Sequence, residues 1–288
     1  MSEICEKMSG FEGRDSDTRI YYRKIAIQKE KNKDFNPGEF FEFFRTYPDK
    51  ILDDNAVDKF YIRIEILIQQ VEVSPEEIDM LFNLISLFKT KGGDWEFGIS
   101  RILACLMKIS DKKNVRHIIW DNSKFVNILI DIHNNLSPIY SRKAAYIFCL
   151  ITQNDTAQHI NEDIFKIIIG LFKGNSAKDN NEICLVSANA ICNLCRTKWA
   201  NIISSDLEIL ELISSYKHIL QSISTVKKFM ILIVESLKNE TFLIRMNLEY
   251  KPKLIECIDK INSYTGADSS YKREIEKLSS EAKAILNP

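Results

Sequence analysis

The feature that most constrains the fold of this chain is a repeat of apolar, helix-length segments about every 40 to 45 residues. Five residues occupy similar places in this pattern, each in an apolar segment that is followed by a polar loop and a second apolar segment: Tyr61, Arg101, Tyr146, Asn189 and Phe229. Their successive separations are 40, 45, 43 and 40 residues. A unit of this length cannot bury its own apolar face, so neighbouring units must stack and share one extended core.

Within each unit the apolar residues follow the spacing of helices rather than strands. Ten segments have this spacing: 56–71, 75–89, 96–109, 124–134, 140–152, 162–172, 182–196, 207–220, 225–238 and 251–261. Two helix starts place a proline after a capping hydroxyl, at Ser74-Pro75 and at Ser137-Pro138. Residues 268–286 form a further amphipathic segment that we interpret as a capping helix. Only nine glycines and six prolines are present, too few for the turns of a sandwich, a barrel or a doubly wound sheet.

A period of roughly 40–47 residues with two or three helices per unit is typical of armadillo and HEAT repeats. We therefore predict an all-α, right-handed superhelical solenoid of about five to six such repeats. Residues 37–288 would form this solenoid and its capping helix. Residues 1–36 are rich in Lys and Arg and poor in large aliphatic side chains, so they are expected to form a separate, flexible basic arm.

Composition excludes several classes of function. The 39 basic and 40 acidic residues give a formal net charge of −1, so no overall field favours binding to nucleic acid or to an anionic membrane. The longest apolar run, residues 164–172, is far shorter than a membrane span. The seven cysteines are odd in number and lie mostly in apolar runs, and the first residues are too polar for a secretion signal. These features predict a reduced protein of the cytoplasm and nucleus.

Motifs for catalysis or for metal binding are not found. The pair Cys192 and Cys195 has metal-ligand spacing but lacks a second pair or a nearby histidine, so we expect core packing with one half-exposed thiol. The four histidines are widely scattered, and Gly92-Gly93 is a turn rather than a phosphate loop. The sequence therefore predicts no enzyme activity, no cofactor and no metal site.

One segment, residues 185–198, resembles the third helix of an armadillo repeat. Its small residues Ser187 and Ala188 would let helices approach closely, and Asn193 would point from the inner face. A side-chain amide in that position can bond the backbone of an extended peptide both as donor and as acceptor. The alternative for Asn193 is a structural role in the solenoid core, and the sequence leaves both open.

The basic arm is similar to the importin-β-binding segment of the importin-α family. A Gly-Arg-x-Ser turn, residues 13–16, precedes a basic cluster and a helix with further lysines; the residues that carry this resemblance are Arg14, Arg19, Arg23, Lys24, Lys29, Lys31 and Lys33. The resemblance implies a monomeric nuclear import adaptor that binds an importin-β-like carrier through the arm and a cargo protein with an extended peptide signal through the solenoid. It further implies that the arm can bind in the groove of its own chain and compete with cargo.

The same resemblance assigns a cargo groove to Arg101, Tyr146, Asn154, Asn189 and Asn193. Where the family has tryptophan, this chain has Arg101, Tyr146 and Asn189. Of the positions where the family has asparagine, only Asn193 keeps it, and the other two hold cysteine and leucine. An arginine in the groove would repel a lysine-rich signal.

A different class of function fits the same repeats. The chain could serve as an armadillo scaffold or regulatory interaction module for cytoskeletal or chaperone partners, without a transport role and with an incidental basic arm. Binding to an importin-β-like carrier separates these two hypotheses. Nucleic-acid binding through the arm is a third and weaker hypothesis, because the acidic residues of the solenoid cancel the charge of the arm.

Overall fold

The computed structural model of the chain describes residues 36–46, 54–70, 72–91, 96–153, 155–174, 181–214, 223–263 and 269–287. Every regular element in these ranges is helical. The elements are α3 (Pro37–Thr46), α4 (Asp54–Gln69), α5 (Pro75–Lys91), α6 (Glu96–Ile109), α7 (Lys113–Asp121), α8 (Ser123–Asn135), α9 (Pro138–Ile151), η3 (Ala157–His159), α10 (Glu162–Gly174), α11 (Asn181–Leu194), α12 (Ala200–Ser205), α13 (Leu207–Ser214), α14 (Ile223–Leu237), α15 (Glu240–Arg245), η5 (Met246–Tyr250), α16 (Lys251–Asn262) and α17 (Ser269–Leu286).

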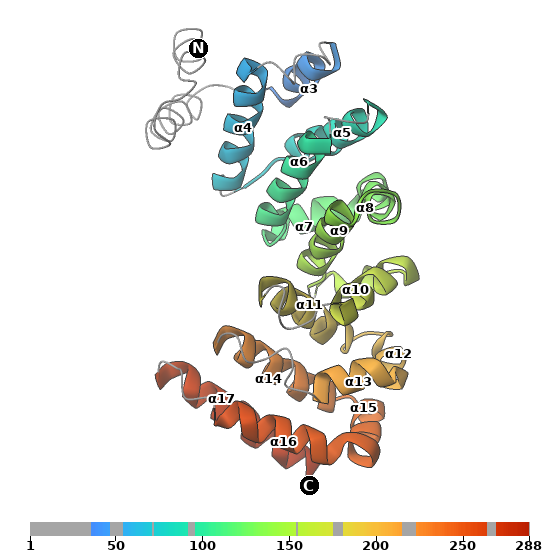
Figure 1. Ribbon diagram of the computed structural model, residues 1–288, viewed down its shortest axis with the longest axis vertical. Helices are drawn as coiled ribbons and strands as arrows, with labels where there is room; N and C mark the ends of the chain where they lie inside the picture. Colours follow the sequence, from blue (N-terminus) through green and yellow to red (C-terminus); the bar gives the residue numbers. More distant parts are fainter. Residues whose placement is uncertain are drawn as a thin grey trace. The chain divides into compact units, whose positions relative to one another are not determined.

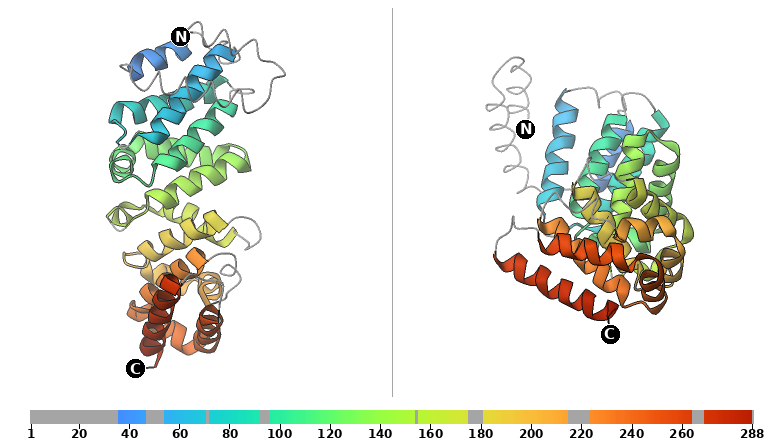
Figure 2. Two further views of the ribbon diagram at one scale, coloured as in Figure 1. Left: turned by 90° about the vertical axis from the view of Figure 1, so that its left-hand side faces the viewer. Right: turned by 60° about the horizontal axis from the view of Figure 1, so that its bottom comes forward.

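The helices form two compact units, the first ending at Lys143 and the second beginning at Ala144. In the first unit α5 packs against α3, α6, α7 and α8, and α4 packs against α6. In the second unit α11, α14 and α17 pack in a row, α10 lies against α11, and α13 contacts α14 and α16 (Figure 1). The short helices α12 and α15 contact each other, and α16 and α17 lie side by side at the end of this unit (Figure 2).

The predicted period is confirmed by the ends of the helices. We call the last helix of each repeat its third helix; these are α4, α6, α9, α11, α14 and α17. The first five end at Gln69, Ile109, Ile151, Leu194 and Leu237, at separations of 40, 42, 43 and 43 residues. The all-helical repeat architecture follows directly from this regular spacing.

The register of the five marker residues needs a correction. Tyr61, Arg101 and Phe229 each lie eight residues before the end of their helix, whereas Tyr146 and Asn189 lie five residues before it. The five positions therefore fall into two classes about one helical turn apart. Sequence spacing alone cannot detect this shift, because residues three apart share one helix face.

Polar contacts between repeats have the same period. The side-chain amide of Asn114 donates to the Val73 carbonyl at 2.9 Å, 41 residues away. The Lys143 ammonium donates to the hydroxyl and the carbonyl of Ser100, 43 residues away, at 2.7 and 3.2 Å. Each bond satisfies a loop or helix group of one repeat with a side chain from the next, so it fixes the spacing of the two repeats.

Helix starts follow the predicted capping chemistry. The Ser74 hydroxyl accepts from the Glu77 amide at 3.2 Å, and the Glu77 carboxylate accepts from the Ser74 amide at 2.9 Å, which is a capping box. The helices α5 and α9 begin at Pro75 and Pro138, as the sequence predicts. The other oxygen of Glu77 bonds Arg63 of α4, so this cap also ties two helices together in the core.

Among the described residues, no helix is long and apolar enough to cross a membrane. In the same part of the chain, no three His, Cys, Asp or Glu side chains gather where they could hold a metal ion.

Candidate functional site

The row of third helices in the second unit carries a ladder of charged side chains. The Arg196 guanidinium donates to one Glu235 carboxylate oxygen through Nε at 3.0 Å, and its Nη2 lies 2.8 Å from the same oxygen. The other oxygen of Glu235 lies 3.0 Å from the ammonium of Lys238, which also contacts Glu281 at 3.1 Å. The ladder therefore runs from the end of α11 across α14 to α17. We call Arg196, Glu235, Lys238 and Glu281 the charge ladder.

Glu235 is the central group of the charge ladder. Burial alone would raise the pKa of its carboxyl, but hydrogen bonds from Lys238 and Arg196 and their positive charges hold it below the usual value. The pKa of Lys238 is raised by its hydrogen bonds to Glu235 and Glu281. Both shifts favour the charged forms, so Glu235 and Lys238 are ionised near neutral pH.

A small pocket opens at the end of α11, beside the charge ladder. Its volume is about 280 Å³, and its lining residues are Gln158, Asn193, Arg196, Thr197 and Lys198. Two of them are cations, three are neutral hydrogen-bonding side chains, and none is a carboxylate. Such a pocket offers donors to a carboxylate or to a backbone carbonyl of a bound segment. We call it the α11 pocket.

Asn193 has a structural partner in addition to its place in this pocket. Its side chain is only 6% exposed, and its Nδ2 donates to the Thr152 carbonyl at 2.9 Å. Thr152 directly follows α9, 41 residues earlier, so the bond joins successive repeats. This contact supports the structural role that the sequence left open, while a contact between Asn193 and a peptide stays a prediction.

The other predicted groove residues lie in different environments. Arg101 is exposed on α6, and Asn189 is half-buried on α11. Tyr146 is 4% exposed, which places its ring in the core rather than on an open surface and corrects its assignment as a groove wall. Asn154 lies outside the described residues. The structure thus places Asn189 and Asn193 one turn apart on α11, whereas Tyr146 is buried on α9.

The seven predicted carrier-binding residues of the arm also lie outside the described residues. They are Arg14, Arg19, Arg23, Lys24, Lys29, Lys31 and Lys33. Their role stays a prediction from the sequence.

The first unit also presents cations near its third helices. Lys143 is half-buried against Ser100, and its pKa is lowered by burial and by the charge of Arg101. Two positive groups therefore lie close enough to interact. The sequence predicts a groove position for Arg101 but not for Lys143, because the position of Lys143 next to α6 follows only from the packing of repeats.

The cysteine pair at the end of α11 is buried. Cys192 and Cys195 are both 4% exposed, which corrects the expectation of one half-exposed thiol. Burial raises the pKa of Cys192 to about 11 and that of Cys195 to about 12. The Cys195 sulfur instead lies 3.5 Å from the Ser236 hydroxyl, 41 residues later, as part of the packing of α11 against α14.

Solved structures show the fold that this chain shares. An engineered protein solved by the Northeast Structural Genomics Consortium superposes with a TM-score of 0.62 at 13% identity, over 99% of this chain and 68% of that one. The designed armadillo repeat protein YIII(Dq)4CqI superposes with a TM-score of 0.54 at 15% identity, over 88% of this chain and all of that one. The chain therefore has the all-α fold of an armadillo repeat solenoid. No protein-family model matches the sequence, and no curated protein matches it.

Proposed function

We propose that this chain is a protein-binding armadillo scaffold that holds an extended segment of a partner protein against its third helices. The α11 pocket is the observation that supports this proposal. It lies at the end of a third helix and combines amide and hydroxyl groups with two cations. An extended segment has unpaired backbone groups and projecting side chains, and these are the groups that such a pocket satisfies.

The charges around the pocket favour a segment with carboxylate side chains. Lys198 has no carboxylate partner among the described residues, and Arg196 is held in place by Glu235. An acidic residue of a bound segment would form charge-assisted hydrogen bonds in the α11 pocket, whereas a lysine would be repelled.

Selection from a library of random extended peptides displayed on phage tests this proposal. The wild-type chain should enrich peptides that contain Asp or Glu, because these residues can bind the α11 pocket. The variant Gln158→Ala with Lys198→Ala should lose that enrichment, because both side chains line the pocket. Lys166→Ala, on the exposed face of α10, serves as the matched control and should keep it. Equal enrichment by all three proteins would contradict the proposal.

A second candidate function is favoured by the basic pattern at residues 13–33. In this proposal the chain is a nuclear import adaptor that resembles importin-α and moves between cytoplasm and nucleus. The arm, residues 1–36, would bind an importin-β-like carrier, and residues 37–288 would hold the cargo. The α11 pocket favours acidic segments, so cargo recognition there would differ from that of lysine-rich signals.

A pull-down of importin-β by the full-length chain tests the carrier proposal. Replacement of Arg14, Arg19, Arg23 and Lys24 by alanine should abolish retention of the carrier, since these charges supply the contact. Replacement of four exposed cations of α10 and α17, Lys166, Lys272, Arg273 and Lys277, controls for total charge and should leave retention unchanged. Failure of the wild-type chain to retain importin-β at low salt would exclude the carrier role and leave the scaffold proposal untouched.

A further inference from the structure

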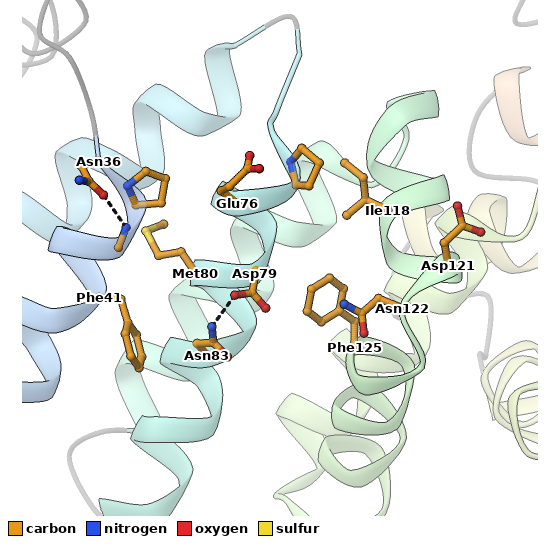
Figure 3. A pocket seen from close by; sticks show the side chains of 13 residues that line it. Asn36, Phe41, Glu76, Asp79, Met80, Asn83, Ile118, Asp121, Asn122 and Phe125 are labelled. Carbon is orange, nitrogen blue, oxygen red and sulfur yellow. Dashed lines mark hydrogen bonds between the residues drawn. The ribbon is translucent and has the colours of Figure 1, made fainter.

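The first unit contains a groove that is lined by α3, α5, α7 and α8 rather than by its third helices. Its volume is about 690 Å³ (Figure 3). The helix α5 forms its base, α3 lies on one side, and the junction of α7 and α8 lies on the other. None of the residues assigned above to cargo or carrier binding lines it. We call it the α5 groove.

The floor of the α5 groove is apolar and firmly held. Phe41 of α3 and Ile118 of α7 are half-buried, while Met80 and Phe125 between them are nearly buried. The ring of Phe125 stacks on that of Phe82, with centroids 4.4 Å apart and planes 8° from parallel. A bound apolar side chain would meet Phe41 and Ile118 on a floor that does not need to rearrange.

The rim of the α5 groove is acidic. Glu76, Asp79 and Asp121 line it, and among the residues that the structure describes no lysine or arginine does (Figure 3). Asp79 lies 3.7 Å from the Lys124 ammonium, but neither Glu76 nor Asp121 has an ion-pair partner among the described residues. The described lining therefore carries negative charge from Glu76 and Asp121 that no ion pair of this part of the chain compensates, around an apolar floor.

Helix capping accounts for only part of this charge. Glu76 lies in the first turn of α5, where a hydrogen bond from its own backbone amide lowers its pKa and the helix dipole favours a carboxylate. Asp121 is the last residue of α7, where the dipole disfavours one. The cap of α8 is supplied by Asn122, whose side chain accepts from the Lys124 amide at 3.1 Å. Neither the end of α7 nor the cap of α8 therefore explains why a carboxylate is present at Asp121.

The walls of the groove are tied together before any ligand binds. Lys124 of α8 donates to the side-chain oxygen of Asn83 on α5 at 2.6 Å, and Lys89 of α5 pairs with Asp131 of α8 at the other end of the two helices. On the opposite wall, the Asn36 side chain caps α3 by accepting from the amides of Gly38 and Glu39 at 3.0 and 3.2 Å. These contacts preform the groove.

We propose that the α5 groove binds a short segment of a partner protein in which a large apolar side chain is flanked by lysine or arginine. The apolar side chain would occupy the floor, and the basic residues would pair with Glu76 and Asp121. The partner chemistry is opposite to that of the α11 pocket, so the chain would carry two binding sites of opposite charge preference. The proposal does not depend on the function of the third helices.

Fluorescence anisotropy with two labelled probes tests the proposal on the full-length chain. The first probe is the peptide Lys-Lys-Leu-Trp-Leu-Lys-Lys, and the second replaces its lysines with glutamines, which neither site should attract by charge. The chain should bind the lysine probe at least about tenfold more tightly than the glutamine probe. Glu76→Gln with Asp121→Asn should weaken binding of the lysine probe about fivefold. The matched control, Glu162→Gln with Asp163→Asn in the first turn of α10, should not change it.

Photo-crosslinking locates the probe. A lysine probe with benzoylphenylalanine in place of tryptophan should crosslink to Met80 or to the neighbouring floor residues. Crosslinks that map elsewhere, including to residues 1–35, would overturn the proposal. Equal affinity for the two probes, or equal loss in the groove and control variants, would do the same. Occupation of the groove by the basic arm of the same chain would appear as a full-length protein that binds neither probe, and this too overturns a partner segment as the occupant.

Discussion

At the scale of single residues, Asn193 separates structural from binding roles. The hydrogen bond from its side-chain amide to the carbonyl of Thr152 is buried, and Thr152 itself is fully buried. Asn193→Ala leaves that carbonyl without a partner, so we expect a loss of about 1–3 kcal/mol in the free energy of unfolding. Asn189→Ala, at a half-buried position of the same helix, should change it by less than about 0.5 kcal/mol. Urea unfolding measures both values, and equal losses would refute the structural role.

Some residue-scale features could be predicted from the sequence and others could not. The capping box of Ser74 and Glu77 is local, because both partners lie within one helical turn. The partner of Asn193 lies 41 residues away, so it becomes visible only when the repeats are stacked. The same reason explains why Tyr146 was assigned to a surface: its burial depends on the neighbouring elements rather than on its own helix.

At the scale of helices, two glycines make a matched pair. A Cβ atom added to Gly98 of α6 would lie 2.6 Å from two ring carbons of Phe88 on α5, whereas one added to Gly170 of α10 would meet nothing within 4 Å. Gly98→Ala should therefore lower the free energy of unfolding by about 1–3 kcal/mol. Gly170→Ala should raise it by about 0.5–1 kcal/mol through helix propensity. Thermal or urea unfolding of the two variants checks the opposite signs.

The charge ladder joins α11, α14 and α17, so we expect the stability that it contributes to their packing to depend on pH. The pKa of Glu235 is lowered in the folded state, so its stabilising contribution is complete above its unfolded pKa and is lost as pH falls through the folded value. Between about pH 6 and about pH 3, the wild-type chain should lose more stability than Glu235→Gln. Urea midpoints at the two pH values measure the difference. Glu276→Gln, at an exposed site on α17, should behave as wild type, and an identical pH response in Glu235→Gln would contradict the prediction.

The long helices were predictable from periodicity, but the short ones were not. The helices α12 and α15 have six residues each, which is under two turns and too short to show a helical period. Their contact with each other is tertiary and is set by the stacking of repeats. The α5 groove escaped prediction for a similar reason, since its lining comes from three segments spread over residues 36–125.

At the scale of the whole molecule, the sequence period predicts the repeat fold because every unit must bury its apolar face against the next. It does not predict the boundary between the two compact units, which falls within α9. In repeat proteins, stability is approximately a sum over units and their interfaces. A core defect should therefore destabilise its own unit more than a distant one.

Buried thiols in each unit allow that difference to be measured. Burial raises the pKa of Cys105 in α6 and of Cys257 in α16 to about 12, so both thiols should react with iodoacetamide only when their surroundings open. Phe82→Ala removes a fully buried ring in the first unit at a cost of about 3–5 kcal/mol. Labelling of Cys105 should then accelerate by about a hundredfold or more, while that of Cys257 changes much less.

A variant in the second unit tests the same prediction in the opposite direction. Phe242→Ala removes a buried ring from α15 in the second unit, so it should accelerate labelling of Cys257 more than that of Cys105. Mass spectrometry of the two cysteine peptides gives both rates from one reaction. Equal acceleration of both thiols in either variant would mean that the chain opens as one cooperative block. We expect faster labelling of Cys105 in Phe82→Ala and of Cys257 in Phe242→Ala. This result follows if each unit of the solenoid holds its own binding site and opens on its own.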